Sequence, residues 1–220
     1  MPSLSSATGA SVSQNGSTLH IDQNAAKAVL NWNSFNVGKD ASVVFVQPSS
    51  SAVALNLIDA AHGASSIDGS LRANGNVFLI NSAGILFGSN AKVNVGGLVA
   101  SSLGLAEDDG DAYVLARGDH AAASVVNQGS ITAGNGGSVN LVGNHVANRG
   151  AIAADNGAIR LLSADQVKVT MDTAGAIGLQ LVAAASQSAD GAGAAVENSG
   201  SLRAGSGQIL LQAASNGLSD

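Results

Sequence analysis

The densest group of residues that could do chemistry is the acidic segment Glu107-Asp108-Asp109-Gly110-Asp111. Closely spaced carboxylates are the ligands that calcium prefers in proteins. The calcium loop of an EF-hand needs a glycine where this chain has Ala112, and it needs a later glutamate that is missing here. We therefore expect a solvated acidic loop, and no metal site, at this segment.

Histidine and carboxylate chemistry is equally sparse. The histidines are His20, His62, His120 and His145. None belongs to an HExxH pattern, and the chain has no cysteine that could share a zinc ion or act as a nucleophile. The acids of the first 106 residues are Asp22, Asp40, Asp59 and Asp68. Glycan-cleaving enzymes need clustered carboxylates. We therefore predict no catalytic residues, no enzyme activity and no cofactor.

The charge pattern excludes two classes of partner. The formal net charge is −6, and lysine and arginine form no cluster. A surface that binds nucleic acid or anionic lipid is basic, so neither partner is expected. No apolar run approaches the roughly 20 residues that a spanning helix needs, so we expect no membrane insertion.

A short phrase recurs along the chain and indicates the elements that position these residues. It reads Gly69-Ser70-Leu71-Arg72-Ala73 in its first copy, and further copies begin at Gly129, Gly150 and Gly200. Neighbouring copies are offset by 60, 21 and 50 residues, and each leads to glycine and then an apolar strand. A period near ~20 residues, with one enlarged coil, indicates a solenoid in which each unit packs only against its neighbours.

Short strands joined by glycine-rich bends favour an all-β protein, a parallel β-helix of roughly ten coils. Asn15-Gly16 predicts a hairpin near the beginning of the chain. The Ala- and Gly-rich run 183–195 is expected to form a loop on the enlarged coil. Leucine-rich repeats have a similar period, but their L-x-x-L-x-L phrase is absent.

One asparagine stands two residues before each later repeat glycine. These residues are Asn127, Asn148 and Asn198. If they stack at one bend, their amides form a hydrogen-bonded ladder, as in other stacked β-coils. We predict such a structural ladder, because a buried amide without partners costs about 1–3 kcal/mol.

The aromatic residues divide the chain. Five of six lie in the first half: Trp32, Phe35, Phe45, Phe78 and Phe87. We expect a single domain over residues 1–220, with an irregular capping and nucleus region at about 1–106 and regular β-helix coils at about 120–220. The chain stops after a repeat strand without a distinct cap, so we expect an N-terminal fragment of a longer protein.

Several motifs between residues 10 and 103 resemble one known family. They are Asn31-Trp32-Asn33-Ser34-Phe35-Asn36-Val37-Gly38, Val43-Val44-Phe45-Val46-Gln47-Pro48, Ala73-Asn74-Gly75-Asn76-Val77-Phe78-Leu79-Ile80-Asn81, Gly84-Ile85-Leu86-Phe87-Gly88 and Val93-Asn94-Val95-Gly96-Gly97-Leu98. Together they resemble the two-partner-secretion (TPS) domain of filamentous-haemagglutinin-type TpsA exoproteins from Gram-negative bacteria. In place of the family's usual Asn-Pro-Asn-Gly, this chain has Asn81-Ser82-Ala83-Gly84, and where an arginine is common it has Leu57.

The resemblance implies a right-handed parallel β-helix with extra short strands capping its N-terminal end. It also implies a role: the domain, a monomer, reaches the periplasm and binds the POTRA domains of an outer-membrane TpsB-type transporter. The exoprotein then folds outside, at the cell surface or in the extracellular space. The absence of cysteine suits passage through an oxidising periplasm. Two alternatives stay open: a host-binding adhesin β-helix and a carbohydrate-active β-helix enzyme.

The family motifs select the candidate recognition residues. They are Asn31, Trp32, Phe35, Asn36, Gly38, Asn56, Asn81, Gly84 and Gly88. We expect Trp32 and Phe35 to lie in the core, and Gly84 and Gly88 to meet requirements of the backbone. For Asn81, a turn-forming role and a partner-related role both remain open.

Overall fold

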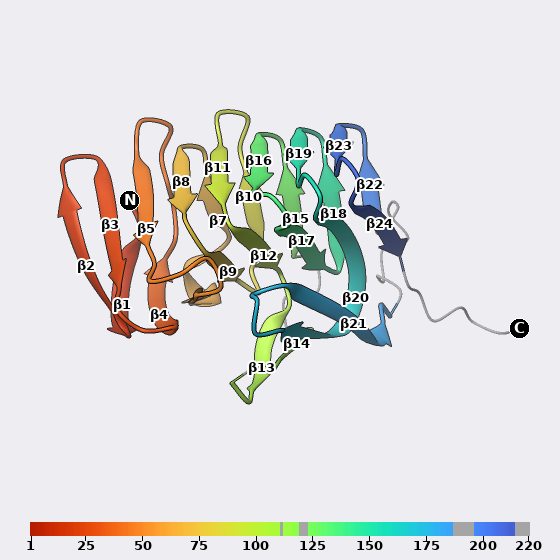
Figure 1. Cartoon of the computed structure of the whole chain (residues 1–220), viewed down its shortest axis with the longest axis horizontal. Coiled ribbons are helices and arrows are strands. Elements are labelled where there is room, and N and C mark those ends of the chain that lie inside the picture. Colours follow the sequence, from red (N-terminus) through yellow and green to blue (C-terminus); the bar gives the residue numbers. More distant parts are fainter. Residues whose placement is uncertain (111, 119–122, 187–195, 214–220) are drawn as a thin grey trace, which may run out of the picture.

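The computed structural model describes residues 1–110, 112–118, 123–186 and 196–213. In this part of the chain the backbone winds into a stack of coils, and the strands of successive coils form three sheets (Figure 1). Nearly all contacts between coils are parallel strand pairs, so the predicted right-handed parallel β-helix is confirmed. The only described helical segment is the short 3₁₀ turn η1 (Ala60–His62).

Three sheets make up the walls of the coil. Sheet A contains β1 (Ser3–Thr8), β4 (Lys27–Ser34), β6 (Val53–Ile58), β9 (Asn76–Ile80), β12 (Gly97–Ser101), β17 (Ser138–Gly143), β20 (Ala158–Met171) and β24 (Gln208–Ala213). Sheet B contains β2 (Ala10–Asn15), β3 (Thr18–Gln23), β5 (Ser42–Val46), β8 (Ser70–Ala73), β11 (Lys92–Val95), β16 (Ser130–Ala133), β19 (Ala151–Ala153) and β23 (Ser201–Arg203). Sheet C contains β7 (Ser65–Ile67), β10 (Ile85–Phe87), β15 (Ser124–Asn127), β18 (His145–Asn148) and β22 (Val196–Asn198).

Two antiparallel strands close the N-terminal end of the stack. β1 pairs antiparallel with β4, and β2 pairs antiparallel with β3. The β2–β3 connection is the hairpin that Asn15-Gly16 predicts, and Gly16 has φ +57°, which suits glycine in a tight turn. The predicted N-terminal cap is therefore present.

The repeat glycines are required by the close approach of successive coils. An added Cβ at Gly137 would lie 1.9 Å from the Gly96 carbonyl oxygen, and one at Gly157 would lie 1.7 Å from that of Gly137. A side chain cannot fit at such distances. Glycine therefore recurs with the coil because each bend rests directly on the backbone of the bend before it.

The chain has two hydrophobic cores. One fills the inside of the coil, and its large side chains include Trp32, Phe35, Phe45 and Phe87. The other lies on the outer face of sheet A, where Phe78 and Tyr113 meet at 5.2 Å between ring centroids. This outer core is covered by β13 (Gly104–Asp108), β14 (Ala112–Ala116), β21 (Ile177–Ala184) and the second half of β20.

The expectation of roughly ten coils was wrong. In the described residues, sheet B holds seven parallel strands, one for each coil, from β3 to β23. Two coils, not one, are enlarged: one by the β13–β14 hairpin and one by the β20–β21 hairpin. We call these two hairpins the excursions. Their residues lie outside the stack, so dividing the chain length by a uniform period gives too many coils.

The two loops expected from the sequence, at 107–111 and 183–195, overlap these hairpins. Glu107 and Asp108 belong to β13, and Ala183 and Ala184 belong to β21, so strands replace parts of two expected loops. Asp111, Asp119, His120 and the range 187–195 lie outside the described residues. Within the described ranges, no group of three or more His, Cys, Asp or Glu residues could hold a metal ion.

Candidate functional site

The nine motif residues lie in the first three coils: on or next to β4 and β6, in the bend between β9 and β10, and directly after β10. Trp32 and Asn56 form the centre of this region. The indole Nε1 of Trp32 donates to Asn56 Oδ1 at 2.9 Å, and Asn56 Nδ2 donates to the carbonyl oxygens of Ala54 and Phe78 at 3.0 and 3.1 Å. Trp32 is 1% exposed and Asn56 0%, so this network ties together three consecutive strands of sheet A inside the coil.

Phe35 completes the aromatic part of the core. Its ring packs edge-on against Trp32, with 5.2 Å between the centroids and an interplanar angle of 84°. Phe35 is fully buried. Both aromatic side chains therefore act through packing within the domain, and neither is available to a docked partner.

Asn31, Asn36 and Gly38 are the motif residues nearest the surface. Asn31 Nδ2 donates to Ser6 Oγ at 2.9 Å, which joins β4 to the capping strand β1. The exposed Asn36 accepts the backbone N–H of Ser66 at 2.8 Å through Oδ1, which joins the first coil to the second. Gly38 is exposed, and an added Cβ there would meet no atom within 4 Å.

Asn81 and Gly84 form one turn. Asn81 Oδ1 accepts the backbone N–H of Ala83 at 2.9 Å, and Nδ2 donates to Gly63 O at 3.1 Å and to Ser65 Oγ at 3.0 Å. The side chain is fully buried, so Asn81 both forms the turn and ties it to the preceding coil. Gly84 has φ +112°, a conformation that L side chains rarely adopt.

Gly88 is required by a neighbouring carboxylate. An added Cβ would lie 2.3 Å from Asp68 Oδ1. Asp68 in turn accepts the backbone N–H and the side-chain Nδ2 of Asn90 at 3.2 and 2.9 Å. The glycine therefore allows an aspartate of one coil to bind the bend of the next.

The three later asparagines stack at one bend. Asn127 Nδ2 donates to Asn148 Oδ1 at 2.8 Å, and Asn148 Nδ2 donates to Asn198 Oδ1 at 2.8 Å. Asn127 and Asn148 are fully buried, whereas Asn198 is exposed at the end of the described stack. Their contribution to the stability of the coil stays a prediction.

The sequence did not indicate the side-chain contacts that hold the β13–β14 and β20–β21 hairpins in place. Lys27 on β4 forms an ion pair with Asp108 on β13, with Nζ–Oδ distances of 2.5 and 2.7 Å, and its Nζ lies 4.8 Å from the ring centroid of Tyr113. Burial by itself lowers the pKa of Lys27, but Asp108 and Tyr113 more than offset burial and raise the pKa above its ordinary value. Burial raises the pKa of Asp108, whereas Lys27 and the N–H of Gly110 lower it, and the net pKa is lowered.

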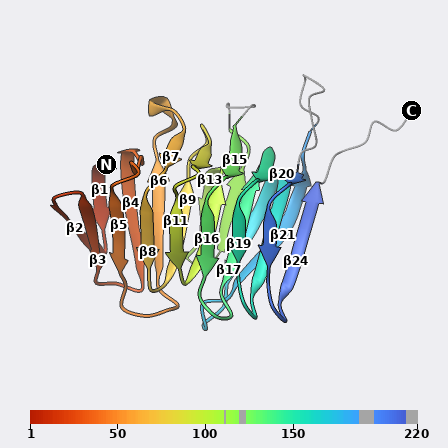
Figure 2. The same ribbon diagram turned by 90° about the horizontal axis from the view of Figure 1, so that it is seen from above.

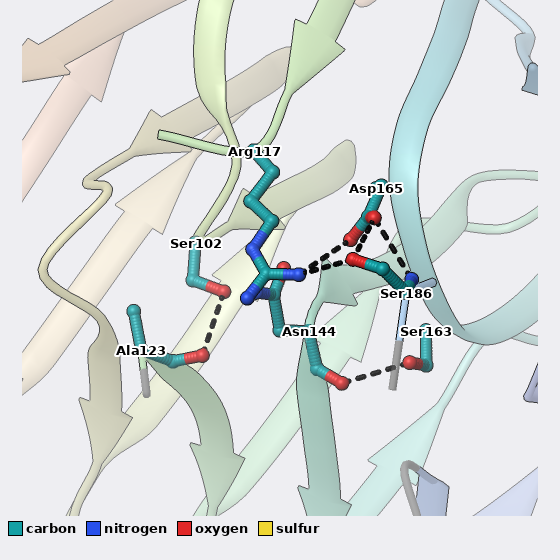
Figure 3. Close-up of polar contacts among 7 residues, drawn as sticks. All are labelled: Ser102, Arg117, Ala123, Asn144, Ser163, Asp165 and Ser186. Carbon is teal, nitrogen blue, oxygen red and sulfur yellow. Dashed lines mark hydrogen bonds and ion pairs between the residues drawn. The ribbon is translucent and has the colours of Figure 1, made fainter. Parts of the chain in front are cut away.

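A second fastening joins β14 to β20 and the segment after β21 (Figure 3). The guanidinium of Arg117 points toward Asp165 and Ser186, and Asp165 Oδ2 also accepts the backbone N–H of Ser186 at 2.8 Å. Beneath this group, Ser163 Oγ donates to the Asn144 carbonyl oxygen at 2.8 Å. The partners of Arg117 are 48 and 69 residues away in the chain, so no local pattern indicates them.

These contacts form a scaffold that positions strands. Neither the core network of Trp32 and Asn56 nor the fastening of Arg117 and Asp165 holds a histidine. In the described ranges, moreover, no helix has the length and apolar character needed to cross a membrane. The geometry is that of a β-solenoid with a closed N-terminal end and specific bonds between its first coils.

Comparison with known proteins places this solenoid in a family. The family model described as the TPS secretion domain matches residues 2–219, and the chain belongs to this family. Members are the secretion domains of TpsA exoproteins, which Gram-negative bacteria secrete with a TpsB transporter as the partner. The family is one of secretion domains and not of enzymes.

Two curated relatives and two solved structures are similar to the chain. A heme/hemopexin-binding protein of Haemophilus influenzae strain Rd is 39% identical over 93 residues, which cover 42% of this chain and 10% of that protein. A second protein of the same name and species is 42% identical over 82 residues, covering 37% of this chain and 9% of that protein. The matched part of the chain thus spans about a tenth of the length of these relatives.

Among solved structures, the HMW1 secretion domain from Haemophilus influenzae has a TM-score of 0.80 and 28% identity, covering 96% of this chain and 56% of that one. The filamentous hemagglutinin secretion domain has a TM-score of 0.57 and 14% identity, covering 98% and 97%. The second likeness concerns the fold alone. Together with the family match, the structures agree with the resemblance that the sequence motifs indicate.

Proposed function

We propose that this domain directs its exoprotein to a TpsB-type transporter by binding the periplasmic POTRA domains, and that it crosses the periplasm as a monomer on the way to the cell surface or the extracellular space. Family membership supports the general role. The docking step is supported by the capping strands, because β1 and β2 each have one paired neighbour in the described structure. Their free edges offer backbone groups to an added strand, a common mode of recognition.

The observation that carries the proposal is that motif residues position this edge and join the first coils. Asn31 binds Ser6 on β1, Trp32 binds Asn56 on the next coil, and Asn36 binds the backbone of Ser66. Each bond joins different strands of the stack, so it forms only when two turns of the chain meet. The first coils are therefore a specific nucleus for folding, and later coils add by nearest-neighbour stacking.

The two ends of the stack differ in a way that supports growth in one direction. The N-terminal end is closed by antiparallel strands, whereas β22, β23 and β24 lie at the other end of the described stack with their parallel partners on one side only. Ile209 and Leu211 of β24, in register with the inner-core residues Ile159 and Leu161, are 46% and 43% exposed. A further coil on this side would bury them, and such stacking outside the cell would hinder backward movement of the exoprotein.

Binding between the purified chain and the isolated POTRA domains of its transporter tests docking. Asn31→Ala frees β1 from β4 at one point, and we expect it to weaken binding about three- to ten-fold. Asn135→Ala, a change of an exposed asparagine in a later coil, is the matched control and should bind like the wild type. A wild-type chain that does not bind the POTRA domains refutes the docking step.

Refolding kinetics test the nucleus. Asn56→Leu removes the acceptor of Trp32 and keeps the tryptophan as a fluorescent probe, so we expect refolding to slow. Asn148→Leu removes a comparable buried amide from a later coil and should mainly speed unfolding. If both variants change only the unfolding rate, the first coils are not the nucleus.

A further inference from the structure

A polar groove of about 800 Å³ crosses the outer face of sheet B. It passes over β3, β5, β8, β11 and β16, which run side by side in Figure 2. Six hydroxyl groups line it: Ser17, Thr18, Ser42, Ser70, Ser89 and Ser130. Neighbouring strands lie about 4.8 Å apart, so the groove extends for roughly 19 Å along the axis of the coil.

Three cations face this groove: Lys39, Arg72 and Lys92. All three are exposed, and within the described part of the chain none of them forms an ion pair. The one acid in the lining is Asp40. Although the formal net charge of the protein is −6, this strip of its surface carries a net positive charge. The ammonium and guanidinium groups on it can donate hydrogen bonds to an anionic ligand.

The strand register places two of these cations together. Lys92 is paired in register with Ser70, and Arg72 follows Ser70 by two residues on the same face of β8. The Oγ atom of Ser70 is buried and has no hydrogen-bond partner among the described residues. A buried hydroxyl without a partner is uncommon in proteins. The groove thus contains two adjacent exposed cations, and the hydroxyl oxygen of Ser70 in its lining is buried and unpartnered among the described residues.

We propose that this groove binds a linear acidic oligosaccharide, such as one that carries sulfate or uronate groups. Anionic groups would pair with Arg72 and Lys92, and sugar hydroxyls would hydrogen-bond to the serine hydroxyls. Repetition of the coil gives the groove a length that suits a chain of sugars more than a single small ion. The lining has no aromatic side chain and no aliphatic side chain larger than alanine, so it lacks the pockets with which peptide-binding sites hold apolar anchors.

Equilibrium binding of a size-defined heparin hexasaccharide to the whole chain, at physiological ionic strength, tests this proposal. Arg72→Gln combined with Lys92→Gln should weaken binding by about a hundred-fold, or roughly ten-fold for each charged contact. Lys168→Gln with Arg149→Gln removes two charges outside the groove and should change binding less than about three-fold. Retained melting temperature and POTRA binding in both variants would show that folding and the proposed transporter contact are intact.

A poly-glutamate peptide of equal charge is the second probe. Binding of the hexasaccharide that depends on Arg72 and Lys92 and exceeds that of poly-glutamate supports the proposal. Equal binding of the two probes overturns the choice of a sugar ligand in favour of an acidic peptide. An equal loss in the control variant, or no binding by the wild type, overturns the site. A loss of POTRA binding in the groove variant assigns the groove to the transporter and also overturns it.

Discussion

Substitution of Asn148 by leucine tests whether the asparagine stack stabilises the coil. Asn148 is fully buried and accepts the Asn127 amide at 2.8 Å, and it donates to Asn198 Oδ1 at 2.8 Å. Leucine has a similar volume, so it removes both bonds without opening a large cavity. After the change, Asn127 Nδ2 keeps only the Gly129 carbonyl oxygen, at 3.3 Å.

The expected cost follows from these contacts. A buried amide donor that loses its main acceptor costs about 1–3 kcal/mol, and the bond to the exposed Asn198 adds about 1 kcal/mol. The apolar leucine regains part of this by burial, so the free energy of unfolding should fall by about 2–4 kcal/mol. For a chain of this size, we expect the melting temperature to fall by about 5–10 °C.

Thermal unfolding followed by far-ultraviolet circular dichroism measures this shift, and hydrogen exchange at the Gly129 amide gives a local readout. That N–H donates to Asn127 Oδ1 at 3.1 Å, so it should exchange faster in the variant. Asn135→Leu is the control, because the Asn135 side chain accepts the Asn156 amide in an exposed pair. If both variants melt at the same temperature, the buried stack does not stabilise the coil as reasoned here.

Three further predictions follow from the turns, the charge pair and the glycine column. Gly84→Val should lower export in a paired secretion assay several-fold more than Asp109→Ala, because valine resists φ +112°; the reverse ranking contradicts the role of this turn. The lowered pKa of Asp108 means that its ion pair with Lys27 stabilises the fold above the ordinary carboxyl pKa and is lost as the pH falls through the lowered value. In denaturant titrations, Asp108→Asn should therefore remove about 0.5–1 kcal/mol at neutral pH and progressively less as the pH falls, and a loss that does not change with pH contradicts this. Gly157→Ala should lower the unfolding midpoint by several degrees, since the new Cβ would collide with a carbonyl oxygen at 1.7 Å; an unchanged midpoint shows that the coils separate at little cost.

The repeated phrases were sufficient to predict the solenoid because each carries its own physical cause. The glycines recur where coils touch, and Asn127 and Asn148 recur where amides stack. These are contacts between neighbours in a periodic structure, so their spacing in the sequence is the spacing of the coil. The family motifs added the cap and the identity of the first coils.

The excursions could not be predicted in the same way. Lys27 and Asp108 are separated by 81 residues, and Arg117 and Asp165 by 48. The single strand β20 begins in a parallel coil and ends in an antiparallel sheet over the outer core. The alternation of apolar and polar residues in β20 breaks at Leu161-Leu162 and again at Asp165-Gln166, near the point where the partner changes, but such a break does not identify the new partner strand. The boundary near residue 106 and the roles of the motif residues in recognition remain predictions.

Export of a fusion protein tests the central claim most directly. A Sec signal peptide, residues 1–220 and a reporter would be produced in a Gram-negative host with or without the TpsB-type transporter encoded beside the natural exoprotein. We predict reporter in the medium only when the transporter and the domain are both present. Equal release without the transporter, or with the domain deleted, contradicts the assignment of this β-helix as the part that selects its exporter.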